Sequence, residues 1–166
     1  MLVALVMLAR GVLAPEPGTE RGTRAATAQL RYLGRGLEAR GDAMQELFPE
    51  GRVFTYALYG LAWVDVGRGT EDAKLRAHAL AEARRALALA ESPRSRSTFG
   101  EAGGLPYGMF YEGWTAHLRA GVLHLGGGAP ADTAFRAACD RLETAFAAGE
   151  PFLESYRGAA WPADNA

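Results

Sequence analysis

Apolar residues recur at helical spacing along most of the chain, and glycines and prolines separate the segments in which they do so. Residues 22–40 place three leucines on one stripe and are followed by Gly41, so they predict an amphipathic helix that ends at this glycine. Residues 51–66 are apolar on most sides, which predicts a buried helix. The first half of the chain thus combines one amphipathic and one buried helix.

The second half repeats this alternation. Residues 70–92 predict an amphipathic helix with Thr70 as its N-cap, because acidic residues follow in the first turn. Residues 108–125 are again apolar on nearly all sides, and residues 130–148 carry a single apolar stripe. Residues 92–104 are rich in serine, arginine and glycine, which predicts a surface loop or, alternatively, a clasp for an anionic group. The pattern as a whole predicts an all-α fold.

A short turn motif recurs at nearly constant spacing. A hydrophobic residue, proline, any residue and a small turn-compatible residue occur at 48–51, 105–108 and 161–164, and these motifs start 57 and 56 residues apart. Proline fits the first turn of a helix, where its missing N–H removes no helical hydrogen bond. The period predicts consecutive antiparallel αα-hairpins of about 57 residues, each with a buried inner helix and an amphipathic outer helix. Residues 1–166 would form a single all-α domain of about three hairpins.

The amino-terminal apolar run allows two interpretations. Residues 2–11 align at an offset of 58 with residues 60–69, which indicates the second half of another buried inner helix. A secretory signal also contains such a run, but this one lacks the basic start of a signal peptide. The run is too short to span a bilayer, which takes about 20 apolar residues. We therefore expect a buried helix and no membrane span.

Composition narrows the class of protein. Eighteen basic and 19 acidic residues give a formal net charge of −1, so there is no positive excess to drive binding to nucleic acid. A single cysteine cannot form a disulfide within the chain. No two of the three histidines stand three or four residues apart, so we expect neither a metal site nor another cofactor. None of these features indicates a cellular compartment.

Three segments carry a resemblance to a known group of folds. They are Phe-Pro-Glu-Gly-Arg at 48–52, Leu-Pro-Tyr-Gly-Met-Phe-Tyr-Glu-Gly-Trp at 105–114, and Ser-Tyr-Arg-Gly-Ala-Ala-Trp-Pro-Ala-Asp at 155–164. Inner helices that begin after such turns resemble the (α/α)-toroid group, which includes six-hairpin glycosidases, unsaturated glucuronyl hydrolases, sugar epimerases and linalool dehydratase-isomerase-like proteins. The resemblance implies a partial toroid, because this chain holds about half the hairpins of a closed one. Either partner subunits complete the toroid, or the chain is a fragment of a longer protein, or it is an open helical array without catalysis.

The resemblance also implies where a site would lie. In toroids the active site is at the amino-terminal ends of the inner helices, which directs attention to the three turns. Glu112 and Asp164 would form an acid–base pair there. Six more residues would contact the substrate: Glu50, Tyr107, Tyr111, Trp114, Tyr156 and Trp161. In the other interpretation, the acidic residues complement helix amino termini and the aromatic rings pack the core. His117 is expected in the core.

Two functions follow as hypotheses. The chain is a portion or subunit of a toroid enzyme, of glycosidase, lyase or isomerase type, that acts on a carbohydrate-like or other small organic substrate by general acid–base chemistry. Alternatively, it is a non-catalytic αα-repeat interaction module or an inactive fragment. In either case, self-association could complete the toroid.

Overall fold

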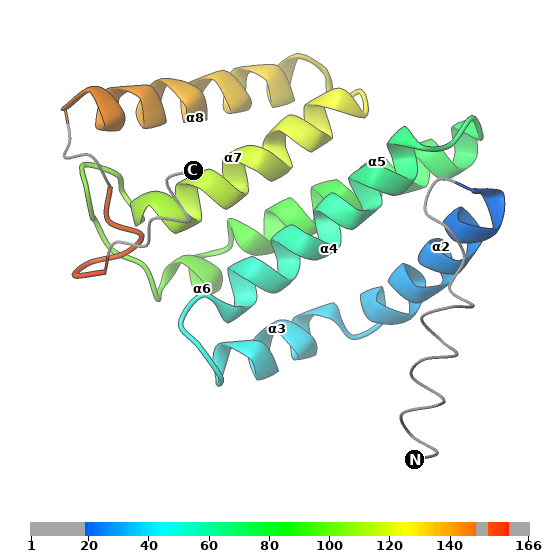
Figure 1. Cartoon of the computed structure of the whole chain (residues 1–166), viewed down its shortest axis with the longest axis horizontal. Coiled ribbons are helices and arrows are strands. Elements are labelled where there is room, and N and C mark those ends of the chain that lie inside the picture. The colour runs from blue at the N-terminus through cyan, green and yellow to red at the C-terminus, as the bar shows by residue number, and fades with distance from the viewer. Residues whose placement is uncertain (1–18, 149–152, 160–166) are drawn as a thin grey trace.

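The computed structural model describes residues 19–148 and 153–159, and every regular element within these ranges is a helix (Figure 1). The helices are α2 (Glu20–Gly34), α3 (Leu37–Gln45), α4 (Gly51–Arg68), α5 (Ala73–Ala90), α6 (Pro93–Arg96), α7 (Gly108–His124) and α8 (Gly128–Ala148). The predicted all-α class is confirmed. The apolar run at 2–11 and the third turn motif at 161–164 lie outside the described residues.

Helix α4 lies at the centre of the arrangement. It packs against α2, α3, α5 and α7, while α7 also packs against α5 and α8. Figure 1 shows α2 and α3 on one side of α4 and α5, and α7 and α8 on the other. The residues that α4 and α5 bring together run in opposite order along the two helices, since Gly60 lies next to Ala86 and Gly67 next to Ala79. These two helices are therefore antiparallel.

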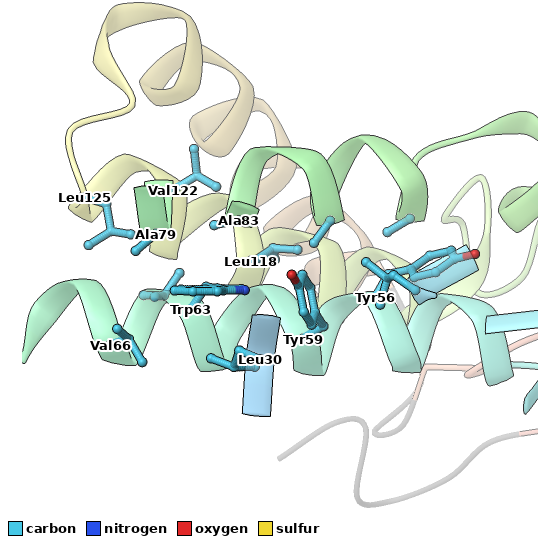
Figure 2. Packing of buried hydrophobic residues seen from close by; sticks show 14 residues of the cluster. Leu30, Tyr56, Tyr59, Trp63, Val66, Ala79, Ala83, Leu118, Val122 and Leu125 are labelled. Atoms are coloured by element: carbon cyan, nitrogen blue, oxygen red, sulfur yellow. The ribbon is translucent and has the colours of Figure 1, made fainter. Parts of the chain in front are cut away.

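The main core surrounds Trp63 of α4, whose side chain is fully buried. Leu118 and Val122 of α7, and Leu125 directly after it, belong to the same cluster, and Tyr59 packs beside Trp63 with its ring edge-on (Figure 2). Helix α5 contributes only alanines to this buried set, which are Ala79, Ala83, Ala86 and Ala90. Small side chains let α5 approach α4 closely. The prediction of buried helices over 51–66 and 108–125 is confirmed, because α4 and α7 supply most of the buried helical residues.

Glycines set the contact between α4 and α7. A Cβ atom added at Gly60 would lie 2.7 Å from Leu118, one at Gly121 would lie 2.7 Å from Val64, and one at Gly67 would lie 2.9 Å from Leu125. These pairs ascend together along both helices, so α4 and α7 run parallel. Their amino-terminal ends consequently lie at the same end of the molecule.

The predicted single helix over 22–40 is wrong in one respect. Helix α2 ends at Gly34, and a second helix, α3, begins after Gly36. Gly41, expected to end the helix, lies inside α3 and is buried. A Cβ atom there would lie 2.6 Å from the hydroxyl oxygen of Tyr56, so the glycine makes room for this ring. Close packing against α4, rather than helix termination, explains this residue.

Two further expectations need correction. The N-cap of α5 is Asp72 instead of Thr70, since Oδ1 of Asp72 accepts hydrogen bonds from the backbone N–H groups of Lys74 and Leu75 at 2.8 and 3.3 Å. The segment 92–104 is not all loop, because its start forms α6. The hydroxyl of buried Ser95 donates to the carbonyl oxygen of Leu89 at 2.7 Å and holds α6 against the end of α5.

Candidate functional site

Aromatic side chains gather where α4 and α7 begin. Phe54 of α4 lies 5.2 Å from Trp114 and 6.2 Å from Phe110 of α7, measured between ring centroids. We call this cluster the aromatic end; it comprises Phe48, Phe54, Phe99, Tyr107, Phe110, Tyr111, Trp114 and Tyr156. Residues from the first two turn motifs therefore meet at one end of the molecule.

The segment 153–159, which leads towards the third turn motif, joins this end. The backbone N–H groups of Met109 and Phe110 donate to the carbonyl oxygens of Glu154 and Ser155 at 2.8 and 3.2 Å. These hydrogen bonds satisfy two donors that the first turn of α7 cannot pair internally. Tyr156 packs against a buried cluster that contains Tyr111. The chain thus returns to the amino terminus of α7 and brings a fourth expected residue to the aromatic end.

Tyr111 and Tyr107 differ in their access to solvent. Tyr111 is only 2% exposed, and burial raises its pKa far above the usual value. Its ring packs against Phe99 and Tyr107, so it serves the core. Tyr107 is half-buried, and the guanidinium of Arg96 lies 5.5 Å from its ring centroid, in cation–π range. Of the two tyrosines, only Tyr107 is accessible to a ligand.

Glu112 does not belong to the aromatic end. Its side chain is 3% exposed, and Oε2 accepts a hydrogen bond at 3.0 Å from Nη2 of Arg141 on α8. Residues two positions apart on a helix point about 200° apart. Phe110 and Trp114 flank Glu112 at this spacing and face α4, so Glu112 faces the opposite way, towards α8. The carboxylate joins α7 to α8.

The other expected site residues are placed as follows. Glu50 is half-buried and immediately precedes α4, but its side chain makes no capping hydrogen bond. Trp161 and Asp164 lie outside the described residues. The proposed pairing of Glu112 with Asp164 therefore stays a prediction.

Trp114 keeps part of its ring accessible to solvent. It is half-buried at the edge of the aromatic end, and the imidazole of His117 lies roughly parallel to it with the ring centroids 6.5 Å apart. His117 is exposed, so the expectation of a core histidine is wrong. The spacing of three residues between Trp114 and His117 places both on one helix face and was the signal available in the sequence.

A polar network beside the aromatic end was not predicted. The Asp42 carboxylate of α3 binds Nε of Arg52 at 2.8 Å and Nη2 of Arg94 at 2.9 Å, and the hydrogen bond from Arg52 holds its pKa below the usual value. The Gln45 side chain accepts from the backbone N–H of Arg52 at 3.2 Å. Because Arg94 pairs with Asp42 and Arg96 lies over Tyr107, these two arginines serve contacts within the fold.

Other kinds of site find no support in the part of the chain that the structure describes. No cluster of three or more histidine, cysteine, aspartate or glutamate side chains is arranged there to hold a metal ion. None of the helices in this part has the length and apolar character needed to cross a membrane. Comparisons with protein-family models, curated proteins and solved structures found no match to this chain.

Proposed function

We propose that the chain forms consecutive αα-hairpins of a partial (α/α)-toroid, with α4 and α7 as neighbouring inner helices. The support is the pairing of residues across these parallel helices. Gly60 and Leu118 are 58 residues apart, and Val64 and Gly121 are 57 apart, close to the spacing of the turn motifs. Each inner helix thus meets nearly equivalent positions of the next, as stacked repeats do.

The aromatic end is then the substrate side of this array. The observation that carries the proposal is the convergence of Phe54, Trp114 and Tyr156, from segments far apart in the sequence, at the start of the inner helices. Sites for small organic molecules are lined mainly by apolar and aromatic side chains with a few polar groups. Trp114, Tyr107 and His117 supply such a lining for a carbohydrate-like or other small organic substrate.

The geometry of the aromatic end supports substrate binding more than acid–base catalysis by Glu112. A general acid or base must come within hydrogen-bond reach of the substrate, and the ion pair with Arg141 turns Glu112 away from the aromatic end. Acid–base catalysis by Glu112 and Asp164, and with it a glycosidase, lyase or isomerase activity, rests on the resemblance to toroid enzymes alone. Self-association would supply the remaining wall of such a site.

Binding to Trp114 can be tested directly. The full chain is titrated with glucose, glucuronate and linalool while tryptophan fluorescence and melting temperature are recorded. We expect at least one of these probes to bind and Trp114→Leu to weaken that binding about tenfold or more, while Phe146→Leu on the exposed face of α8 leaves it unchanged. Failure of all three probes to bind the folded chain, or equal binding by Trp114→Leu, would refute the proposal.

A second candidate is a non-catalytic interaction module that pairs with a second copy of this chain. Leu47 is 75% exposed and Leu58 on α4 is 45% exposed, and exposed apolar residues of this size favour protein contacts when they gather on one face. The net charge of −1 creates little repulsion between copies. Sedimentation should then show a dimer that Leu58→Asp converts to a monomer without loss of helicity. A wild-type monomer would exclude this candidate.

A further inference from the structure

A cleft between α2 and α5 lies away from the aromatic end, towards the start of α5. Its larger part has a volume of about 360 Å³, and a smaller part of about 200 Å³ continues from it, because Arg31 and His78 line both. The residues that matter below are Thr27, Arg31, Trp63, Asp72, Lys74 and His78. We refer to this space as the α2–α5 cleft.

Two buried hydrogen-bonding groups in the wall of this cleft have no partner among the described residues. They are Oγ1 of Thr27, a residue 8% exposed, and Nε1 of Trp63, which is fully buried. The indole N–H of Trp63 lies near the Tyr59 hydroxyl but does not reach hydrogen-bond geometry, and that hydroxyl donates to Glu82 at 2.7 Å. An unpaired buried polar group destabilises a protein, and a ligand with acceptor atoms would relieve this cost.

The charges around the cleft favour an anion. Arg31 and Lys74 line it, and within the described part of the chain neither of them forms an ion pair. The acidic residue in the larger part is Asp72, whose carboxylate caps the backbone of α5. In the smaller part, the charge of Glu82 is matched by Arg85 at 3.2 Å. Positive charge is thus left over beside donors that lack acceptors.

The cleft also has an apolar wall. Ala28 and Leu75 line the larger part, and the ring of Trp63 borders the smaller one. The imidazole of His78 stands edge-on to this indole, with 4.9 Å between the ring centroids. The combined space exceeds that of an inorganic oxyanion and is of the size that holds a small metabolite. An apolar body carrying one negative group fits this lining.

We propose that the α2–α5 cleft binds a small organic carboxylate. The carboxylate lies against Arg31 and Lys74, the hydroxyl of Thr27 donates to an acceptor atom of the ligand, and the apolar body lies against Ala28 and Leu75. This site is independent of the proposed function at the aromatic end.

Calorimetric titration of the full chain tests the chemical class of the ligand. The probes are benzoate and phenylacetate, with benzyl alcohol as the uncharged analogue and inorganic phosphate as the anion without an apolar body. We expect one of the carboxylates to bind with a Kd of about 1 mM or tighter, and both control compounds to bind at least about tenfold more weakly. Phosphate binding as tight as the carboxylates would overturn the organic ligand, and absence of carboxylate binding would overturn the site.

Variants locate the binding. Arg31→Gln and Lys74→Gln should each weaken carboxylate binding about tenfold, the loss expected for one charge-assisted hydrogen bond. Arg21→Gln is the matched control, because Arg21 is an exposed arginine of α2 that does not line the cleft. Equal binding by all three variants would place the carboxylate elsewhere and refute the proposal.

A Thr27→Val variant separates ligand binding from simple packing. Valine keeps the shape of threonine and removes the unpaired hydroxyl, so the unliganded variant should melt at a higher temperature than the wild type. The same change should weaken carboxylate binding. A variant that is less stable without ligand, or that binds the carboxylate as tightly as the wild type, would contradict the role of Thr27.

Discussion

The carboxylate of Glu112 and the guanidinium of Arg141, which are 29 residues apart in the sequence, form an ion pair at 3.0 Å that joins α7 to α8. Glu112 is buried, whereas Arg141 is partly exposed and donates a second hydrogen bond to the carbonyl oxygen of Ala137. The arginine is therefore held over the carboxylate by its own helix. This arrangement gives Glu112 a structural role that can be measured independently of any activity.

We expect Arg141→Ala to lower the free energy of unfolding by about 1–3 kcal/mol, because it leaves a buried carboxylate without its partner. Glu112→Gln should cost less, since the amide can still accept a hydrogen bond from Arg141. In the double variant, the loss should be smaller than the sum of the two single losses. Urea unfolding followed by circular dichroism measures all three. Strict additivity would show that the ion pair contributes nothing.

Gly121 packs against Val64 so closely that a larger side chain at this position should overpack the core. Gly121→Ala should destabilise the protein by about 1–3 kcal/mol, because the new methyl group would lie 2.7 Å from a branch of the stiff valine side chain. Combining it with Val64→Ala should recover part of this loss. Gly113→Ala is the matched control on the same helix: its Cβ would make an ordinary contact at 3.4 Å, and it should stabilise by about 0.5–1 kcal/mol. Urea unfolding distinguishes these outcomes.

Tyr59 predicts how stability changes at alkaline pH. Burial and the hydrogen bond to Glu82 raise its pKa to about 12 from an ordinary value of 10.0. The unfolded chain therefore loses this proton first. The contribution of Tyr59 is fully present below pH 10 and is lost as the pH rises from 10 to 12.

Tyr59→Phe should accordingly show a shallower decline of stability above pH 10 than the wild type. Some decline will persist, because burial also raises the pKa of Tyr56 and Tyr111. The urea midpoint at a series of pH values measures this slope. Tyr32→Phe, at a largely exposed tyrosine, provides the control and should leave the slope unchanged. Identical slopes for Tyr59→Phe and the wild type would contradict the assignment.

Gly108 ends the second turn motif and has a positive φ of 76°. A Cβ atom there would be strained by this backbone conformation and would also collide with the carbonyl oxygen of Ser155. Gly108→Ala should therefore destabilise by at least about 1–2 kcal/mol. It should also speed hydrogen exchange at the amides of Met109 and Phe110, which pair with the segment 153–159. Gly100→Ala, where a Cβ has open space, should leave this exchange unchanged.

The helices could be predicted from the sequence because apolar residues at helical spacing report burial directly. Glycine was harder to interpret, since the same residue ends helices and admits close neighbours. Gly41 follows a leucine stripe as a cap would, yet it faces the ring of Tyr56 on another helix. The sequence of residues 22–40 contains no signal that a tyrosine of another helix packs there. The prediction of the α5 N-cap was wrong for a simpler reason. Thr70 and Asp72 are both good capping residues and stand two positions apart.

The site itself stays a prediction. The fold does bring three of the residues singled out in the sequence, Tyr107, Trp114 and Tyr156, into one aromatic cluster. Membership of a motif does not specify the face of a helix, however, and Glu112 lies on the far face from Trp114. The α2–α5 cleft was not predicted, because Thr27 and Trp63 belong to no motif and come to line one cleft only through the packing of α2 beside α4.

The central position of α4 has a consequence for how the chain unfolds. Trp63 and the other buried residues of α4 provide the surface on which α2, α3, α5 and α7 are packed. Loss of this one helix would expose the inner faces of all four at once, so no large subset of them keeps a core of its own. Melting should therefore be a single cooperative event, in which the most slowly exchanging amides lie in the middle of α4.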